Sequence, residues 1–199
     1  MKQNQKRLAI IQVGFRLMDK KGYSGTGISE IIAEAGIPKG SFYHYFQNKE
    51  SFAAEVINFY AQEVLFHVRK KLDDKSISPI MRIKNLYNGY AKSMINTHTF
   101  PYGGFASKIS QEVGEQNMAV RNASCAVFNA IKQTHIECLN EAVGIDEIDK
   151  NTDIKNLAEL IIFAWEGAII RMKGAYKTDS LISFTIMLNE IILPEKQLI

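Results

Sequence analysis

Apolar residues recur at helical spacing through almost the whole chain, and this pattern limits the fold more than any other feature. Near the start, Leu8, Ile11 and Phe15 lie three and four residues apart, so one face of a helix carries all of them. The alternation of apolar and polar residues that is typical of half-buried strands is nearly absent. We therefore expect an all-α protein.

Glycines, prolines and polar segments mark where the helices end. Gly22 is expected to cap the first helix and Gly36 to form a tight turn, and the third helix should start near Pro38. We expect helices near residues 5–21, 28–35, 38–46, 49–72, 79–97, 104–115, 118–142, 151–175 and 178–192. Three short helices thus precede longer ones, which predicts an N-terminal domain over residues 1–50 and a larger helical domain over residues 51–199.

The positive charge of the chain is concentrated in its first quarter. Residues 1–52 contain 8 Lys and Arg and 4 Asp and Glu, a balance of +4, whereas the remaining residues contain 16 and 17, a balance of −1. A basic segment on a nearly neutral body indicates contact with a polyanion. A solvated basic face without a partner fits the charge balance equally well.

Two short helices joined by a tight turn are expected within residues 26–50. Gly36 makes the turn, Ile37 fills it, and the apolar residues of the two helices face one another. This is the pattern of a helix-turn-helix, in which the start of the second helix enters the major groove of DNA. An ordinary helical hairpin is the alternative. The basic balance and the many hydrogen-bond donors at the start of the second helix favour DNA binding.

The candidate DNA contacts lie at the start and the rim of that second helix. Lys39 offers a cation, Ser41 offers a hydroxyl, and Gly40 lets the backbone approach DNA closely. Free backbone donors at a helix N-terminus also favour phosphate. Further side chains that are suited to phosphate oxygens follow at Tyr43, His44 and Lys49.

Residues 5–52 resemble the DNA-binding domain of the tetracycline-repressor (TetR/AcrR) family. The resemblance rests on Gly22-Tyr23, Thr26, Ile28, Ile31, Ala35-Gly36-Ile37, Lys39-Gly40, Phe42-Tyr43-His44-Tyr45-Phe46 and Lys49-Glu50. Gly27 stands where the family usually has a second Thr, and Ile32 stands where it usually has Ala. Gly27 is a tolerable helix cap, but one possible phosphate-binding hydroxyl is lost.

The resemblance implies a role for each candidate residue. The third helix would read the major groove through Lys39, Gly40 and Ser41, with Ser29 nearby. The residues that would position this helix on the DNA backbone are Thr26, Tyr43, His44 and Lys49.

The rest of the chain resembles the C-terminal domain of the same family more weakly. Residues 102–121 are similar to a stretch in one branch of the family, where a Gly-Cys pair often precedes an apolar helix. Gly104 occupies the second position here, so no cysteine sensor is available there. Leu157–Tyr176 and the following helix look like the two dimer-forming helices of the family. Small residues such as Gly167 would let two helices approach closely, or would serve packing within one subunit.

Any small-molecule effector needs a cavity, and the aromatic residues of the second domain are the candidates for its wall. Most of these aromatics are expected in the core. The residues expected to line a ligand pocket are Tyr90, Tyr102, Phe105 and Trp165.

No metal, cofactor or catalytic site is expected. The 4 histidines lack the spacing of a zinc or di-iron site, and no nucleophile, acid/base pair or cofactor loop is recognisable. Cys125 and Cys138 lie roughly 20 Å apart on one expected helix, too far for a disulfide. Buried structural thiols are the default interpretation, and redox sensing is the alternative. The N-terminus lacks a signal-peptide pattern and no apolar run spans a membrane, so we expect a cytoplasmic protein.

Two hypotheses follow from the sequence. The first is a DNA-binding transcriptional regulator, a homodimer on a palindromic operator, that acts as a repressor and is released by a small-molecule effector. The second is a helical small-molecule-binding protein or enzyme without DNA binding. The charge asymmetry and the donor-rich helix start favour the first hypothesis, in which the protein is not an enzyme.

Overall fold

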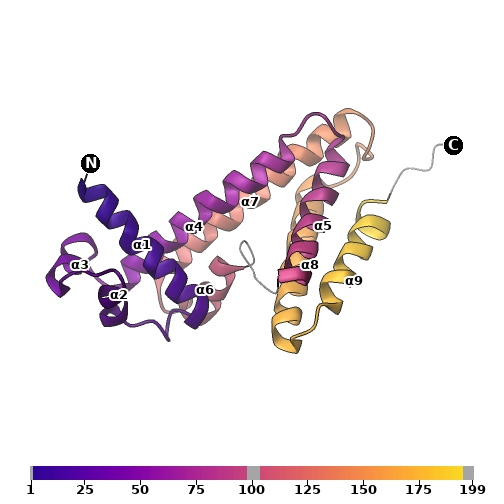
Figure 1. Cartoon of the computed structure of the whole chain (residues 1–199). Helices are drawn as coiled ribbons and strands as arrows, with labels where there is room; N and C mark the ends of the chain where they lie inside the picture. The colour runs from indigo at the N-terminus through magenta and orange to yellow at the C-terminus, as the bar shows by residue number, and fades with distance from the viewer. Residues whose placement is uncertain (1, 98–103, 195–199) are drawn as a thin grey trace. The chain divides into compact units, whose positions relative to one another are not determined.

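The computed structural model describes residues 2–97 and 104–194, which are almost entirely helical (Figure 1). Within these ranges the chain forms nine α-helices, one π-helical turn and no strand. The elements are α1 (Lys2–Lys21), α2 (Ile28–Glu34), α3 (Lys39–Tyr45), α4 (Lys49–Leu72), α5 (Pro79–Thr97), α6 (Phe105–Val113), α7 (Met118–Gly144), α8 (Ile154–Ala175), α9 (Asp179–Met187) and η1 (Leu188–Ile192). The predicted all-α class is confirmed.

Several helix boundaries differ from the predicted ones, and two of these differences have clear local reasons. α8 begins at Ile154 rather than at residue 151, because the carboxylate of Asp153 accepts a hydrogen bond from the backbone N–H of Asn156 at 3.1 Å and so caps the helix. The last predicted helix ends in a π-helical turn, in which the N–H of Leu193 donates to the carbonyl of Leu188 at 2.9 Å.

The chain packs into two compact units. The first unit contains the residues up to Val64 together with Phe105–Asn129, and the second contains the other residues from Leu65 onward. Both α4 and α7 contribute residues to each unit. The functional boundary predicted after residue 50 stays a prediction, because compactness does not by itself define a function.

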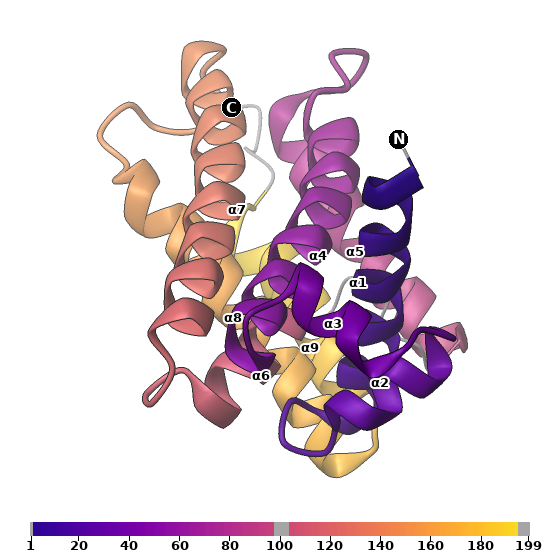
Figure 2. The same cartoon turned by 90° about the vertical axis from the view of Figure 1, so that its left-hand side faces the viewer.

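Aromatic rings from four helices build the core of the first unit. Phe15 of α1 packs against Tyr60 of α4 and Phe105 of α6, with ring centroids 5.8 Å and 4.9 Å away. Phe42 of α3 lies 5.3 Å from Phe52 of α4 and is fully buried. These contacts fix α3 against α4, and Figure 2 looks onto α2 and α3.

The second unit is built from α5, α8 and α9 with the later parts of α4 and α7. Tyr87 of α5, Trp165 of α8 and Phe184 of α9 form a ring cluster with centroid distances of 5.2–5.3 Å. All three side chains are buried, so burial of their apolar area is a major source of stability in this unit.

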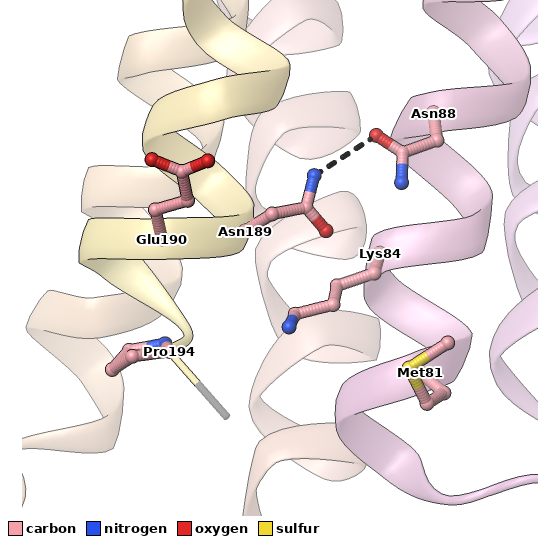
Figure 3. A pocket seen from close by; sticks show the side chains of 6 residues that line it. All are labelled: Met81, Lys84, Asn88, Asn189, Glu190 and Pro194. Atoms are coloured by element: carbon pink, nitrogen blue, oxygen red, sulfur yellow. Dashed lines mark hydrogen bonds between the residues drawn. The ribbon is translucent and has the colours of Figure 1, made fainter. Parts of the chain in front are cut away.

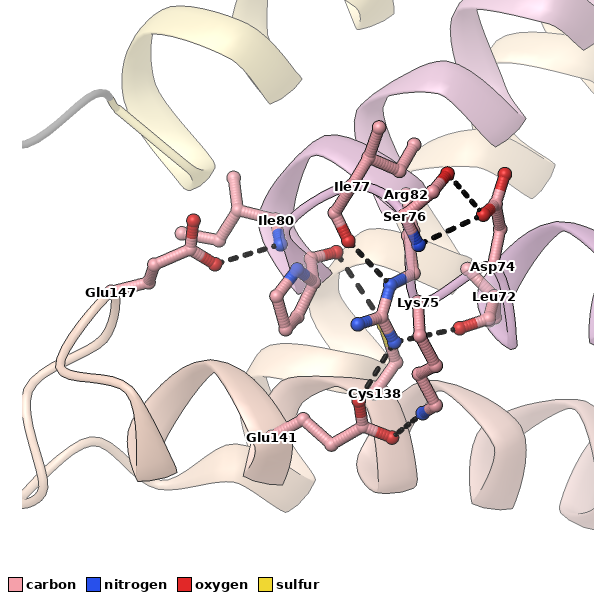
Figure 4. Close-up of polar contacts among 11 residues, drawn as sticks. Leu72, Asp74, Lys75, Ser76, Ile77, Ile80, Arg82, Cys138, Glu141 and Glu147 are labelled. Carbon is pink, nitrogen blue, oxygen red and sulfur yellow. Dashed lines mark hydrogen bonds and ion pairs between the residues drawn. The ribbon is translucent and has the colours of Figure 1, made fainter.

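A buried arginine ties the loop after α4 to α7 (Figure 4). Arg82 is 4% exposed, and its guanidinium donates to the carbonyls of Leu72 and Ile77, both at 3.0 Å, and to the carboxylate of Glu141 at 2.7 Å. Lys75 also pairs with Glu141. Each acceptor satisfies part of the buried cation, which would otherwise destabilise the fold.

The two cysteines differ in exposure. Cys138 is buried, its thiol donates to the carbonyl of Pro79 at 3.4 Å, and burial raises its pKa to about 11. It therefore stays protonated near neutral pH and is a poor nucleophile. Cys125 is exposed, so the default expectation of a buried thiol is wrong at that position.

Candidate nucleic-acid interface

A tight turn between α2 and α3 sets the angle of the helix pair. Gly36 has φ +63°, and its N–H donates to the carbonyl of Ala33 at 3.2 Å. The next N–H, of Ile37, donates to the carbonyl of Ile32 at 3.2 Å. These two bonds form a Schellman motif, whose left-handed residue is most readily a glycine. The prediction that Gly36 makes the turn is confirmed.

Helix α3 is anchored by aromatic residues on one face, which leaves the other face open. Phe42 is fully buried and Phe46 is 2% exposed, and the ring centroids of Phe46 and Phe52 lie 4.7 Å apart. Between these anchors, Tyr43 is 50% exposed and His44 is also exposed. The apolar contacts thus hold the helix while its polar side chains remain accessible.

The first turn of α3 presents the three residues that were predicted to read bases. Pro38 is the N-cap with φ −63°, Lys39 and Gly40 are exposed, and Ser41 is half-buried. A Cβ at Gly40 would meet no described atom within 4 Å. Packing within the described chain therefore does not require a glycine here, whereas close approach of another molecule to the backbone would.

Lys49 stands at the start of α4, where Asn48 and Ser51 form a reciprocal cap. The N–H of Ser51 donates to Oδ1 of Asn48 at 2.7 Å, and the N–H of Asn48 donates to Oγ of Ser51 at 3.3 Å. The ammonium of Lys49 lies 4.1 Å from the ring centroid of Tyr23. The hydroxyl of Tyr23 in turn donates to Glu50 at 3.2 Å.

Burial changes the titration of this lysine and of the tyrosine beneath it. Desolvation lowers the pKa of Lys49, and the carboxylates of Glu50 and Glu112 oppose that shift. Desolvation, together with the charge of Glu50, raises the pKa of Tyr23 to about 12. Lys49 is thus a partly desolvated cation, for which a phosphate anion would be a favourable partner.

The two remaining candidates lie on and just before α2. Ser29 is exposed on the first turn of α2. Thr26 is fully buried, and its hydroxyl donates to the carbonyl of Gly22 at 2.8 Å. In this arrangement Thr26 stabilises the turn after α1, and a phosphate contact from its hydroxyl stays a prediction.

The residues predicted for an effector pocket do not all lie in one unit. Tyr90 and Trp165 belong to the second unit, with ring centroids 6.2 Å apart. Phe105 belongs to the first unit, and Tyr102 lies outside the described residues. A shared pocket of these four residues stays a prediction.

Sequence reasoning missed a buried hydrogen-bonded pair beside Trp165. The hydroxyl of Tyr87 lies 2.9 Å from Nε2 of His135, and Nδ1 of the same histidine lies 2.9 Å from the carbonyl of Ile131. Burial lowers the pKa of His135 to about 4, so the ring is neutral at pH 7. Nδ1–H therefore donates to the carbonyl, and Nε2 accepts from the tyrosine. No sequence signal pairs residues that lie 48 positions apart.

Comparison with known proteins assigns both parts of the chain to the same family. The family described as "Bacterial regulatory proteins, tetR family" matches residues 10–56. The family described as "Tetracyclin repressor-like, C-terminal domain" matches residues 79–184. The chain belongs to the TetR family. The resemblance stated from the sequence is confirmed, and this TetR-family chain is a DNA-binding transcriptional regulator with a C-terminal ligand-binding domain.

Individual relatives agree with this assignment. Transcriptional regulator AcuR of Cereibacter sphaeroides is 33% identical over 89% of this chain and 80% of its own length. The transcriptional repressor DhaR of a Mycobacterium species is 26% identical over 96% of this chain and 94% of its own length. A regulatory protein TetR from Rhodobacter sphaeroides has a similar structure, with a TM-score of 0.80 and 31% identity over 91% of this chain and 95% of its own. These relatives are named as regulators, which favours the first hypothesis over an enzyme or a simple binding protein.

Among the described helices, none is long and apolar enough to cross a membrane. Within residues 2–97 and 104–194, no three His, Cys, Asp or Glu side chains are grouped so as to hold a metal ion.

Proposed function

We propose that this regulator is a repressor that binds a palindromic operator as a homodimer and is released by a small-molecule effector. The outward face of α3 carries the proposal, because its polar residues are exposed over a buried aromatic anchor. Lys39, Gly40 and Ser41 read bases, and Ser29 lies beside them. The contacts to the DNA backbone come from Thr26, Tyr43, His44 and Lys49. The relative DhaR is named a transcriptional repressor, which supports repression rather than activation.

An exposed apolar stripe on α8 and α9 supports the homodimer. Leu160, Phe163 and Ile170 of α8 are 51%, 62% and 52% exposed, and Ile182 and Ile186 of α9 are 46% and 49% exposed. The α8 residues follow helical spacing, and such a patch on one face is typical of an interface. Two copies on an isologous interface would place two reading helices against symmetric half-sites.

The dimer is tested by light scattering on the full chain. Phe163→Glu places a charge on the α8 stripe and should convert the dimer to a monomer. Phe66→Glu, at a 64% exposed position on α4, is the matched control and should leave the dimer intact. A wild-type monomer at micromolar concentration, or equal behaviour of the two variants, contradicts the proposal.

The effector acts by binding the DNA-incompetent state more tightly than the DNA-bound state. Tyr90 and Trp165 of the second unit are the pocket residues on which this proposal rests. The signal passes along α4, which is 24 residues long, roughly 36 Å at 1.5 Å per residue, and contributes to both compact units. Linkage then requires operator DNA to weaken effector binding by the same factor. Calorimetry with and without operator measures this factor, and equal affinities would exclude release by an effector.

A further inference from the structure

A pocket with both polar and apolar lining lies between α5 and the π-helical turn η1 of the second unit (Figure 3). Its volume is about 470 Å³, which falls in the range of small-molecule sites. The lining residues are Met81, Lys84, Asn88, Asn189, Glu190 and Pro194. None of them belongs to the aromatic set that was predicted to hold the effector, so this pocket is a separate site.

Lys84 gives the pocket a cation on a largely buried side chain. The residue is only 4% exposed, and its side chain extends into the gap between α5 and η1 (Figure 3). Among the described residues, Lys84 has no hydrogen-bond or ion-pair partner. The ammonium nitrogen is not among the enclosed polar atoms of the described residues, so it is open to the pocket, where an anion would be a favourable partner.

Two amides stand beside the lysine. Asn88 follows Lys84 by one helical turn on the same face of α5, and its Oδ1 accepts from Nδ2 of Asn189 at 3.3 Å. Asn189 also donates to the carbonyl of Thr185 at 2.6 Å, which fixes its amide. Nδ2 of Asn88 donates to no group in the described part of the chain. It is therefore a hydrogen-bond donor available to a ligand.

The π-helical turn holds the opposite wall in place. Leu188 and Leu193 are buried at the two ends of its hydrogen bond, which leaves Asn189 and Glu190 at the pocket. Single π-turns often occur at functional sites, because the widened turn redirects side chains. Here the redirected residues include the amide that crosses to Asn88.

We propose that this pocket binds a small monoanionic carboxylate. Lys84 pairs with the carboxylate, Nδ2 of Asn88 donates to it, and Met81 and Pro194 contact the apolar part of the ligand. The carboxylate of Glu190 points away from the Lys84 ammonium in Figure 3 but adds negative charge at the rim. Lys84 supplies one positive charge and Glu190 adds one negative charge at the rim. The pocket therefore favours a ligand with one negative charge over one with two, such as the phosphate dianion.

The test is a butyrate titration of the full-length chain at constant ionic strength, followed through the methyl resonance of Met81. The Met81 resonance should shift with saturation, while that of Met118, which is 70% exposed in the first unit, should not. Lys84→Leu should weaken butyrate binding at least tenfold. Lys92→Leu removes an exposed lysine from the same helix and should leave binding unchanged. Equal binding by wild type and Lys84→Leu overturns the proposal.

A second variant covers the case in which Lys84→Leu fails to fold, as judged by circular dichroism. Asn88→Asp preserves the shape of the side chain but adds a negative charge, and it should also weaken butyrate at least tenfold. Undiminished binding by Asn88→Asp contradicts the site. Inorganic phosphate at the same concentration should not shift Met81, and tighter binding of phosphate than of butyrate would overturn the carboxylate assignment.

Discussion

The two compact units each contain a cluster of aromatic rings, but the clusters differ in polarity. In the first unit, Phe42, Phe46 and Phe52 form a hydrocarbon cluster beneath α3. In the second unit, the rings of Trp165 and Phe184 pack against Tyr87, which is hydrogen-bonded to the buried His135. The first cluster contains no titratable side chain, so the exposed polar residues of α3 rest on a core whose rings do not change charge with pH. The second cluster includes the buried His135, so its stability depends on pH.

The largest effect is expected from the anchor of α3. Phe42→Ala removes a fully buried ring and should destabilise the first unit by about 3–5 kcal/mol. Tyr43→Ala, at the neighbouring 50% exposed position, should change stability by less than about 0.5 kcal/mol. Urea unfolding followed by circular dichroism measures both. Similar losses in the two variants would show that α3 is not held as described.

The second effect concerns acid and the polar cluster. The folded-state pKa of His135 is about 4, below the ordinary value of 6.5, so between these values the unfolded chain binds a proton that the folded chain does not. Stability should therefore fall as the pH drops from 6.5 to 4, by roughly 3 kcal/mol from this residue. Urea unfolding across this range should show a shallower pH dependence for His135→Gln than for wild type. His44→Gln, on the exposed face of α3, should keep the wild-type dependence.

A smaller effect is expected when the histidine loses its hydrogen-bond donor. Tyr87→Phe removes the hydroxyl that donates to Nε2 of His135 and leaves a buried acceptor unsatisfied. The expected loss is about 1–3 kcal/mol in the free energy of unfolding at pH 7. His135→Phe should lower the free energy of unfolding by less in the Tyr87→Phe background than in the wild type. Additive losses would mean that the two residues do not interact.

The smallest effect is expected at the surface of the first unit. Arg16 and Glu34 pair at 3.1 Å across α1 and α2, and their side chains are 59% and 40% exposed. Arg16→Ala should cost less than about 1 kcal/mol, with a smaller cost at high salt. Thermal unfolding at two salt concentrations checks this. A large loss that is independent of salt would argue for a packing role of the Arg16 stem.

The spacing of apolar residues made the helices and the exposed face of α3 predictable from the sequence. Gly36 and the apolar positions of α2 and α3 determine the turn, and the exposed residues of α3 follow once Phe42 is recognised as its anchor. The residues of the second unit were harder to predict because their roles depend on tertiary packing. Tyr87 and His135 come together only when α5 packs on α7. The burial of Lys84 was not predictable because no sequence pattern distinguishes a buried lysine from an exposed one. The ring of Phe105 packs on Phe15 and Tyr60 in the first unit, and its place in an effector pocket stays a prediction.

The central claim is that α3 reads DNA as part of a symmetric dimer. The most direct test is selection of duplexes from a random DNA pool by the full-length chain, repeated with Lys39→Ala. The wild type should enrich an inverted repeat with half-sites about one helical turn apart, or a multiple of that distance. Lys39→Ala should relax the preference at one base position, the same in both half-sites, by roughly 1–3 kcal/mol if the contact is to guanine. No enriched sequence, a site without symmetry, or an identical site for both proteins would contradict the account.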